Sequence, residues 1–373
     1  MLVQVLNWIG RNRCLHYLVS VSAMFCMSTA CAERLTGSWP QQSFARGIVY
    51  SSWDGSYSNE AAWRQHLEDF KRLGINWIEI ITFAHQPDVN EPTIIPTSAS
   101  RWPVKFVRSA RAAGFKILLK PHVWSRQFYD GSNRWRGSIN MRSEAAWARW
   151  FSAYEAFILR EAKFAETHGI EMLSIGLEYV EATRQTADWY RIIKRVRTIY
   201  SGQLTYAADG NHELGHVQFW DQLDVIGVDA YFALGDNIQF LGAPLILAWL
   251  RPLRTLAVLS AKYRKPIIFT EAGFPSVAGA TARPWQWPTG REVVDENAQA
   301  LGYNSLLSVF TRQAWFHGVF WWKWYEQPEA NISLAHDYAP AGKLAESVLG
   351  YFYKTRLEQP DAPPQHRSTT SAP

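Results

Sequence analysis

Cysteine is nearly absent from this chain of 373 residues. Its three cysteines, Cys14, Cys26 and Cys31, all fall within the first 32 residues. The rest of the chain therefore has no disulfide framework and must be stabilised by a packed core. Hydrophobic residues make up 47% of the sequence and charged residues 19%, which is enough apolar material for one large domain. We place that domain at residues 45–355.

An excess of one charge is also missing. The formal net charge is +5, to which Arg11 and Arg13 contribute two, and no block of five or more basic residues occurs. The composition therefore gives no support for a nucleic-acid partner or for an anionic membrane surface.

Sequence motifs for cofactors and metals are lacking too. No Gly-x-Gly-x-x-Gly, Walker loop or Gly-x-Ser-x-Gly elbow is present. His85 and His122 stand alone, whereas zinc-dependent barrel hydrolases usually show a His-x-His cluster. We expect neither a cofactor nor a metal ion.

The first 32 residues are typical of a signal peptide. Arg11 and Arg13 precede an apolar stretch from Leu15 to Met27, and Ala30-Cys31-Ala32 fits an Ala-x-Ala cleavage site. The stretch is too short to span a bilayer as a mature helix. We therefore expect a secreted or periplasmic protein without membrane contact after the leader is removed.

A lipoprotein attached through Cys31 is the alternative, although Ser28 stands where a lipobox prefers Leu. Residues 33–44 would form a linker to the domain. Residues 356–373 are polar and rich in proline, so we expect a disordered tail.

The aromatic content is high, with 19 Trp, 16 Tyr and 19 Phe. Pyranose rings offer an apolar face that packs on indole while their hydroxyls bind polar groups, so this composition suits a sugar cleft. For any single Trp, a place in the core is the alternative.

Strand and helix patterns alternate after the leader, which predicts repeated βα units around a parallel sheet. Eight strands are expected, at residues 46–53, 76–83, 115–122, 172–178, 203–209, 223–231, 266–271 and 318–324. Helices are expected at residues 59–73, 102–113, 143–168, 183–200, 241–264, 291–315 and 341–355, with a weak one at 211–220. Eight such units predict an α/β fold, a single-domain (β/α)8 TIM barrel.

Two glutamates end predicted strands. Glu178 closes the run Glu171–Glu178, and Glu271 closes Lys265–Glu271. In a (β/α)8 barrel the C-terminal strand ends form the catalytic face, so both carboxylates would meet there. Two facing carboxylates are what cleavage of a glycosidic bond requires. A surface or strand-end salt bridge is the alternative for either one.

A separation of about 5–5.5 Å between the carboxyl groups would indicate a retaining enzyme, in which Glu271 is the nucleophile and Glu178 the acid/base. A charged Glu271 would disfavour ionisation of Glu178 and keep its proton in place. Tyr231, at the end of its own strand, is the best-placed donor to Glu271.

A set of short motifs occurs in this order along the chain: Lys120-Pro-His122, Trp135-Arg-Gly137, Ile175-Gly-Leu-Glu178, Leu204-Thr-Tyr-Ala207, Phe219-Trp-Asp221, Ile226-Gly-Val-Asp-Ala-Tyr231, Phe269-Thr-Glu-Ala-Gly273 and Phe320-Trp-Trp-Lys-Trp324. With these motifs the chain resembles glycoside hydrolase family 113, in the clan of retaining (β/α)8 glycosidases. The resemblance implies endo-β-1,4-mannanase activity, with Glu178 as acid/base and Glu271 as nucleophile. One departure is Leu177, where most of the wider clan has an Asn that contacts the sugar 2-hydroxyl.

Several further side chains are candidates for sugar binding. Trp322 and Trp324 share one parity on the last strand, so we predict both as stacking platforms. For Lys120, the alternative to sugar binding is a buried ion pair with an acid on a neighbouring strand. The other candidates lie at or after strand ends: Trp53, Asp54, His122, Trp124, Trp135 and Arg136.

These patterns together predict a monomeric, exported, retaining glycoside hydrolase acting on a β-linked polysaccharide, most simply β-1,4-mannan. The alternatives are a glycosidase for another β-glycan or exopolysaccharide, and a non-catalytic carbohydrate-binding barrel.

Overall fold

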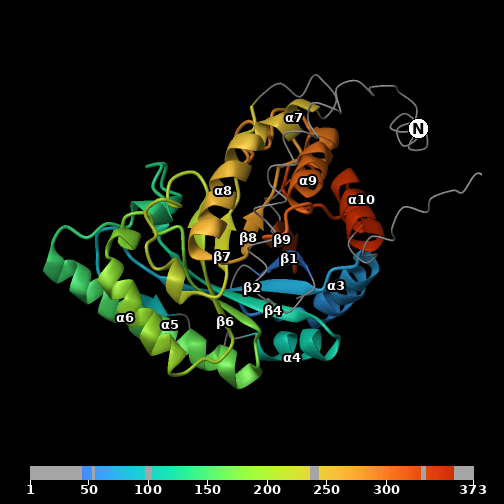
Figure 1. Ribbon diagram of the computed structural model, residues 1–373. Helices are drawn as coiled ribbons and strands as arrows, with labels where there is room; N and C mark the ends of the chain where they lie inside the picture. The colour runs from blue at the N-terminus through green and yellow to red at the C-terminus, as the bar shows by residue number, and fades with distance from the viewer. Residues whose placement is uncertain (1–43, 53–54, 97–102, 236–242, 329–332, 357–373) are drawn as a thin grey trace, which may run out of the picture. The chain divides into compact units, whose positions relative to one another are not determined.

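The computed structural model describes residues 44–52, 55–96, 103–235, 243–328 and 333–356. Over these residues the chain forms a closed parallel barrel with helices outside it (Figure 1). The predicted (β/α)8 barrel is confirmed. The predicted leader, linker and tail fall almost entirely outside the described residues.

Eight parallel strands follow one another around the barrel in chain order. They are β1 (Ala45–Ser51), β2 (Trp77–His85), β4 (Lys116–Trp124), β5 (Met172–Leu177), β6 (Gln203–Asp209), β7 (Ile226–Asp229), β8 (Ile267–Ala272) and β9 (Phe316–Tyr325). Pairing of β1 with both β2 and β9 closes the barrel. Each strand overlaps a predicted one, and a short strand, β3 (Ile95–Pro96), pairs antiparallel with the end of β2.

The helices also follow the predicted pattern. They are α3 (Glu60–Leu73), α4 (Val104–Ala112), α5 (Glu144–His168), α6 (Thr186–Arg197), α7 (Ala243–Ala248), α8 (Leu250–Tyr263), α9 (Glu296–Phe310) and α10 (Leu344–Tyr351), which a π-helical turn (Phe352–Arg356) extends. The single helix expected at 241–264 is therefore two. No described helix is long and apolar enough to cross a bilayer.

The longest helix, α5, begins and ends where its sequence indicates. The Ser143 hydroxyl accepts the Ala146 N–H at its start, and Gly169 takes a left-handed conformation, with φ of 63°, at its end.

The weak helix expected at residues 211–220 does not form, and this connection contains turns and a short 3-10 helix (Trp220–Gln222). The Asp209 carboxylate accepts the N–H groups of Asn211 and His212, which favours a turn over a helix.

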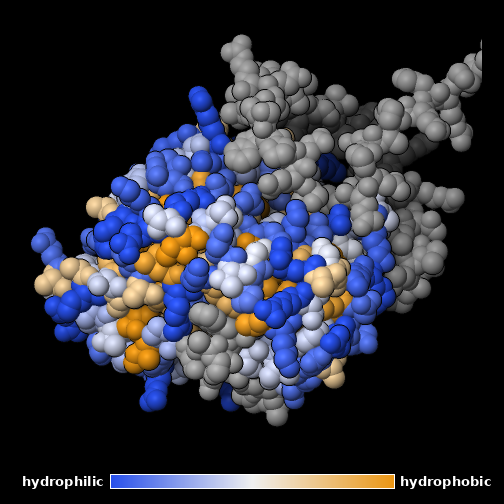
Figure 2. All heavy atoms as spheres, turned by 90° about the horizontal axis from the view of Figure 1, so that it is seen from below, coloured by the Kyte–Doolittle hydropathy of each residue, from blue (hydrophilic) through white to orange (hydrophobic). Residues whose placement is uncertain are grey.

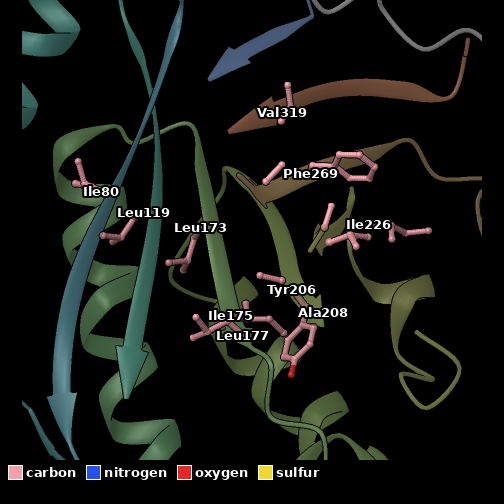
Figure 3. Packing of buried hydrophobic residues seen from close by; sticks show 14 of the residues in the cluster. Ile80, Leu119, Leu173, Ile175, Leu177, Tyr206, Ala208, Ile226, Phe269 and Val319 are labelled. Carbon is pink, nitrogen blue, oxygen red and sulfur yellow. The ribbon is translucent and has the colours of Figure 1, made fainter. Parts of the chain in front are cut away.

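The hydrophobic core has two parts. The larger part lies between the strands and the surrounding helices, and Figure 3 shows some of its side chains, among them Leu119 and Leu173. The smaller part fills the barrel and includes Val49, Leu118 and Phe320. A Cβ on Gly47 would lie 2.4 Å from the Phe320 ring, so glycine makes room for that ring.

The face of the molecule in Figure 2 is mostly hydrophilic, and hydrophobic side chains form separate patches on it. This fits helices such as α3, which buries Trp63, Leu67 and Phe70 on one side.

Candidate active site

Two buried carboxylates lie at the C-terminal ends of β5 and β8. Glu178 directly follows β5, and Glu271 is the next-to-last residue of β8; their exposed fractions are 6% and 3%. Burial raises the pKa of Glu178, and the negative charge of Glu271 raises it further. This electrostatic interaction places the two acids in one site at the catalytic face of the barrel.

Glu271 is held by donors on both oxygens. The Lys120 ammonium donates to Oε1 over 2.6 Å, and the Tyr231 hydroxyl donates to Oε2 over 2.8 Å. The hydrogen bond expected from Tyr231 is thus present. Register shifts between β8 and its neighbours on both sides adjoin Glu271, and such irregularities re-aim a side chain at a barrel rim.

Lys120 lies at the centre of a buried cluster of acids. Besides Glu271, its Nζ lies 3.1 Å from Asp229 and 3.4 Å from Glu79, and Lys120, Asp229 and Glu79 are almost completely buried. Burial alone would lower the pKa of Lys120, but the three carboxylates outweigh it and raise that pKa. Lys120 therefore carries a positive charge that offsets part of the negative charge around Glu271.

The pKa values of the two remaining acids of this cluster are also shifted. Burial, opposed by Lys120, raises the pKa of Glu79 well above its ordinary value. Burial and then the charge of Glu271 do the same for Asp229, whose Oδ1 also accepts the Thr270 hydroxyl over 2.7 Å. The ion pair considered for Lys120 in the sequence exists, and one of its acids is Glu271.

Glu178 is fixed differently from Glu271. Its backbone has a φ of +50°, an uncommon conformation for a residue other than glycine, and its N–H donates to the Ala207 carbonyl over 2.9 Å. The Arg136 guanidinium donates to Oε2 twice, from Nε over 3.1 Å and from Nη2 over 2.7 Å. Arg136 lowers the pKa of Glu178, whereas burial, Glu271 and Asp209 raise it, and the net direction is upward.

His122 is a fully buried residue of β4 and a neutral imidazole. Burial, followed by the positive charges of Arg136, Lys120 and Lys323, lowers its pKa far below the ordinary value. Neither ring nitrogen hydrogen-bonds to any of the described residues.

Aromatic side chains lie near Arg136, the residue that donates to Glu178. Trp124 is half-buried, stacks on Tyr129 with ring centroids 5.3 Å apart, and has the Arg136 guanidinium 5.7 Å from its ring centroid. Half-buried Trp135 has its ring 6.1 Å from that of His212. The loop after β4 thus supplies Trp135 and Arg136 together.

Trp322 and Trp324 do not share a face, which corrects the prediction. Trp322 is half-buried, with the Lys323 ammonium 4.8 Å from its ring centroid. Trp324 is buried against Phe70 of α3, with ring centroids 5.3 Å apart. The pairing of β9 with β1 shifts register between Trp321 and Trp324, so simple alternation fails. Trp53 and Asp54 lie outside the described residues.

Several residues near the site were not identified from the sequence. Glu79 lies within β2 and Asp229 is the last residue of β7, and a lone acid in a strand gives no functional signal until its neighbours in space are known. Trp287, which is 46% exposed, lies in the loop after β8 with its ring 6.5 Å from that of Trp322. The length of that loop in the sequence was the feature that could have indicated a binding residue there. Among the described residues, no group of three or more His, Cys, Asp or Glu side chains is arranged to hold a metal ion.

A parallel barrel with two acids at its strand ends is the arrangement of the (β/α)8 glycosidases. The sequence model of Glycoside Hydrolase Family 113 matches residues 48–343. The chain belongs to this family and is a glycoside hydrolase.

Solved structures agree with this assignment. The GH113 β-mannanase AaManA from Alicyclobacillus acidocaldarius is 27% identical, with a TM-score of 0.72 over 84% of this chain and 98% of that one. A GH113 β-1,4-mannanase is 26% identical, with a TM-score of 0.72 over 84% of this chain and 100% of that one. A β-glucuronidase from Faecalibacterium prausnitzii, at 13% identity, shares the fold alone, with a TM-score of 0.56 over 83% of this chain and 49% of that one. None of the curated proteins matches.

Proposed function

We propose that the protein hydrolyses β-1,4-linked mannan with retention, using Glu271 as the nucleophile and Glu178 as the acid/base. The observation that carries this proposal is the contrast between the two carboxylates. Glu271 accepts one hydrogen bond from the Lys120 ammonium and another from the Tyr231 hydroxyl, whereas the pKa of Glu178 is raised. The β-1,4-mannanases similar to this chain support the choice of mannan.

In the first step the Glu271 carboxylate attacks the anomeric carbon while Glu178 gives its proton to the departing glycosidic oxygen, so that a glycosyl ester forms on Glu271 and the C–O bond breaks. Both Arg136 bonds go to Oε2 of Glu178, which leaves Oε1 as the oxygen that carries the proton.

In the second step Glu178, now a carboxylate, takes a proton from water, and the hydroxide formed attacks the anomeric carbon. The ester bond to Glu271 breaks, and the product keeps its β configuration. The positive charge of Arg136 stabilises the ionised Glu178 that this step requires.

Turnover of purified protein on β-mannan tests the assignment. Glu271→Ala should abolish release of reducing ends, while Glu178→Ala should spare substrates with a good aryl leaving group more than mannan. Proton NMR of the first product should show the β anomer. An α anomer, or full activity of Glu271→Ala, would overturn the proposal.

Another β-glycan is the second candidate, and Leu177 is the observation that favours testing it. Its side chain is fully buried in the core beside Tyr206 (Figure 3), so position 177 makes no contact with a sugar. A panel of β-linked mannan, glucan, xylan and exopolysaccharide, with product sizes measured, decides between them and distinguishes endo from exo cleavage.

We further propose that the protein is exported and monomeric. The apolar stretch in residues 15–27 and the Ala-x-Ala site at residues 30–32 support export. N-terminal sequencing of protein from the culture fluid or periplasm should begin at Glu33, and an intact leader on cytoplasmic protein would contradict this. Light scattering on that material should give the mass of one chain.

A further inference from the structure

A third buried glutamate lies behind the acid/base residue. Glu213, in the connection after β6, is fully buried. Its Oε1 accepts the Tyr206 hydroxyl over 2.5 Å, and its Oε2 accepts the Asp209 N–H over 2.9 Å. Burial raises its pKa well above the ordinary value, so the position is costly for a carboxyl group. The reaction proposed above makes no use of Glu213.

The Tyr206 hydroxyl connects Glu213 to the end of β5. This hydroxyl accepts the N–H of Tyr179, the residue after Glu178, over 2.9 Å. The N–H of Glu178 is bonded to the carbonyl of Ala207 on β6. The N–H groups of Glu178 and Tyr179 are therefore both bonded to β6, and the second bond goes to the Tyr206 hydroxyl that Glu213 holds. In Figure 3 the Tyr206 ring lies beside Leu177, close to the end of β5.

Glu178 needs this support because its own backbone conformation is unfavourable. Its φ of +50° costs free energy for a residue with a Cβ and persists only where neighbouring contacts enforce it. The Tyr206 ring is held in turn by Trp189 and Phe219, at centroid distances of 5.4 and 5.5 Å, so the hydroxyl has a fixed position.

We propose that Glu213 and Tyr206 form a positioning pair that holds the Glu178–Tyr179 backbone so that the Glu178 carboxyl group aims at the glycosidic oxygen. This inference rests on the proposed function of Glu178 as the acid. Neither member of the pair touches the substrate. Their effect is confined to the geometry of proton transfer, which is sensitive to displacements of about 1 Å.

The test compares two substrates that differ in their need for the acid. One is a β-manno-oligosaccharide, whose leaving sugar must be protonated, and the other carries a dinitrophenyl group, which leaves without a proton. kcat/KM reports the first step for both. Tyr206→Phe and Glu213→Gln should lower kcat/KM on the oligosaccharide about 10- to 100-fold and on the dinitrophenyl substrate less than about 3-fold.

The Gln variant keeps one acceptor oxygen and should lose less activity than Glu213→Leu. The double variant Tyr206→Phe/Glu213→Gln should lose little more than Tyr206→Phe alone, because the two side chains act through one contact. Glu161→Gln is the matched control. Glu161 is also a buried acid, hydrogen-bonded to Thr82 behind the sheet, and its change should leave the ratio of the two kcat/KM values as in the wild type.

Equal losses on both substrates, or no loss in Tyr206→Phe and Glu213→Gln, would overturn the positioning pair. These two variants keep nearly all of the packing, so the test does not depend on whether Glu213→Leu folds. A wild-type protein inactive on both substrates would instead contradict the proposed function, which separates the two failures.

Discussion

Replacing Lys120 with Met should destabilise the protein strongly, because the cluster of Glu79, Asp229 and Glu271 would lose its buried cation. Lys120 is fully buried, and its Nζ lies 2.6–3.4 Å from the three acids. Removing one partner of a buried ion pair costs about 3–5 kcal/mol. At about 2 °C per kcal/mol for a chain of this size, Tm should fall by roughly 6–10 °C at pH 7.

The pH dependence of this loss gives a sharper test. Burial raises the pKa of Glu79 and Asp229 in the folded protein, so the folded state keeps protons that the unfolded chain releases. Their contribution to stability therefore falls as the pH rises above the ordinary carboxyl range. Without Lys120 this fall should steepen, so the deficit in Tm should be largest near pH 7 and shrink toward about pH 4.

Calorimetry or circular dichroism between pH 4 and 7 measures the effect. Lys71→Met is the control, because Lys71 and its partner Glu68, 3.0 Å away, are both exposed, and such a pair contributes at most about 1 kcal/mol. If Lys120→Met unfolded at the wild-type temperature across this range, Lys120 would not be the counter-charge for these acids.

Four further substitutions examine single contacts. Tyr231→Phe removes the hydroxyl that donates to Oε2 of Glu271. Because a hydrogen bond to a charged group contributes about 1.5–3 kcal/mol, kcat/KM should fall about 10- to 150-fold. An unchanged kcat/KM would exclude a role of Tyr231 in the first step. Arg136→Met removes the cation that lowers the pKa of Glu178, so the alkaline limb of the pH profile of kcat/KM should move to higher pH. A shift of this limb to lower pH would contradict the expected sign. Trp322→Ala should raise KM for mannan with little change in Tm. Trp324→Ala should instead lower the free energy of unfolding by about 3–5 kcal/mol and leave KM unchanged in the protein that remains folded. The reverse pattern would show that Trp324, and not Trp322, faces the sugar.

The amino-acid sequence was sufficient for the barrel and for the positions of its two strand-end glutamates. Runs of apolar residues between Gly, Pro and polar punctuation reflect burial on both faces of a strand, so the eight strands were predictable. The start of α5 at Ser143 and its end at Gly169 depend on local hydrogen bonds and backbone conformation, which sequence also encodes. The contact of Tyr231 with Glu271 followed because Glu271 lies at the end of β8 and Tyr231 comes shortly after the end of the neighbouring parallel strand β7.

Only the tertiary structure decided which side chains share the site. Alternation predicts the direction of a side chain while a strand stays regular, and the register shift in β9 turned Trp324 toward α3. The Lys120 cluster joins β2, β4, β7 and β8, and the support of Glu178 by Glu213 runs through Tyr206. Such contacts join residues far apart in the chain, and their energies depend on burial and distance, which a linear pattern does not contain.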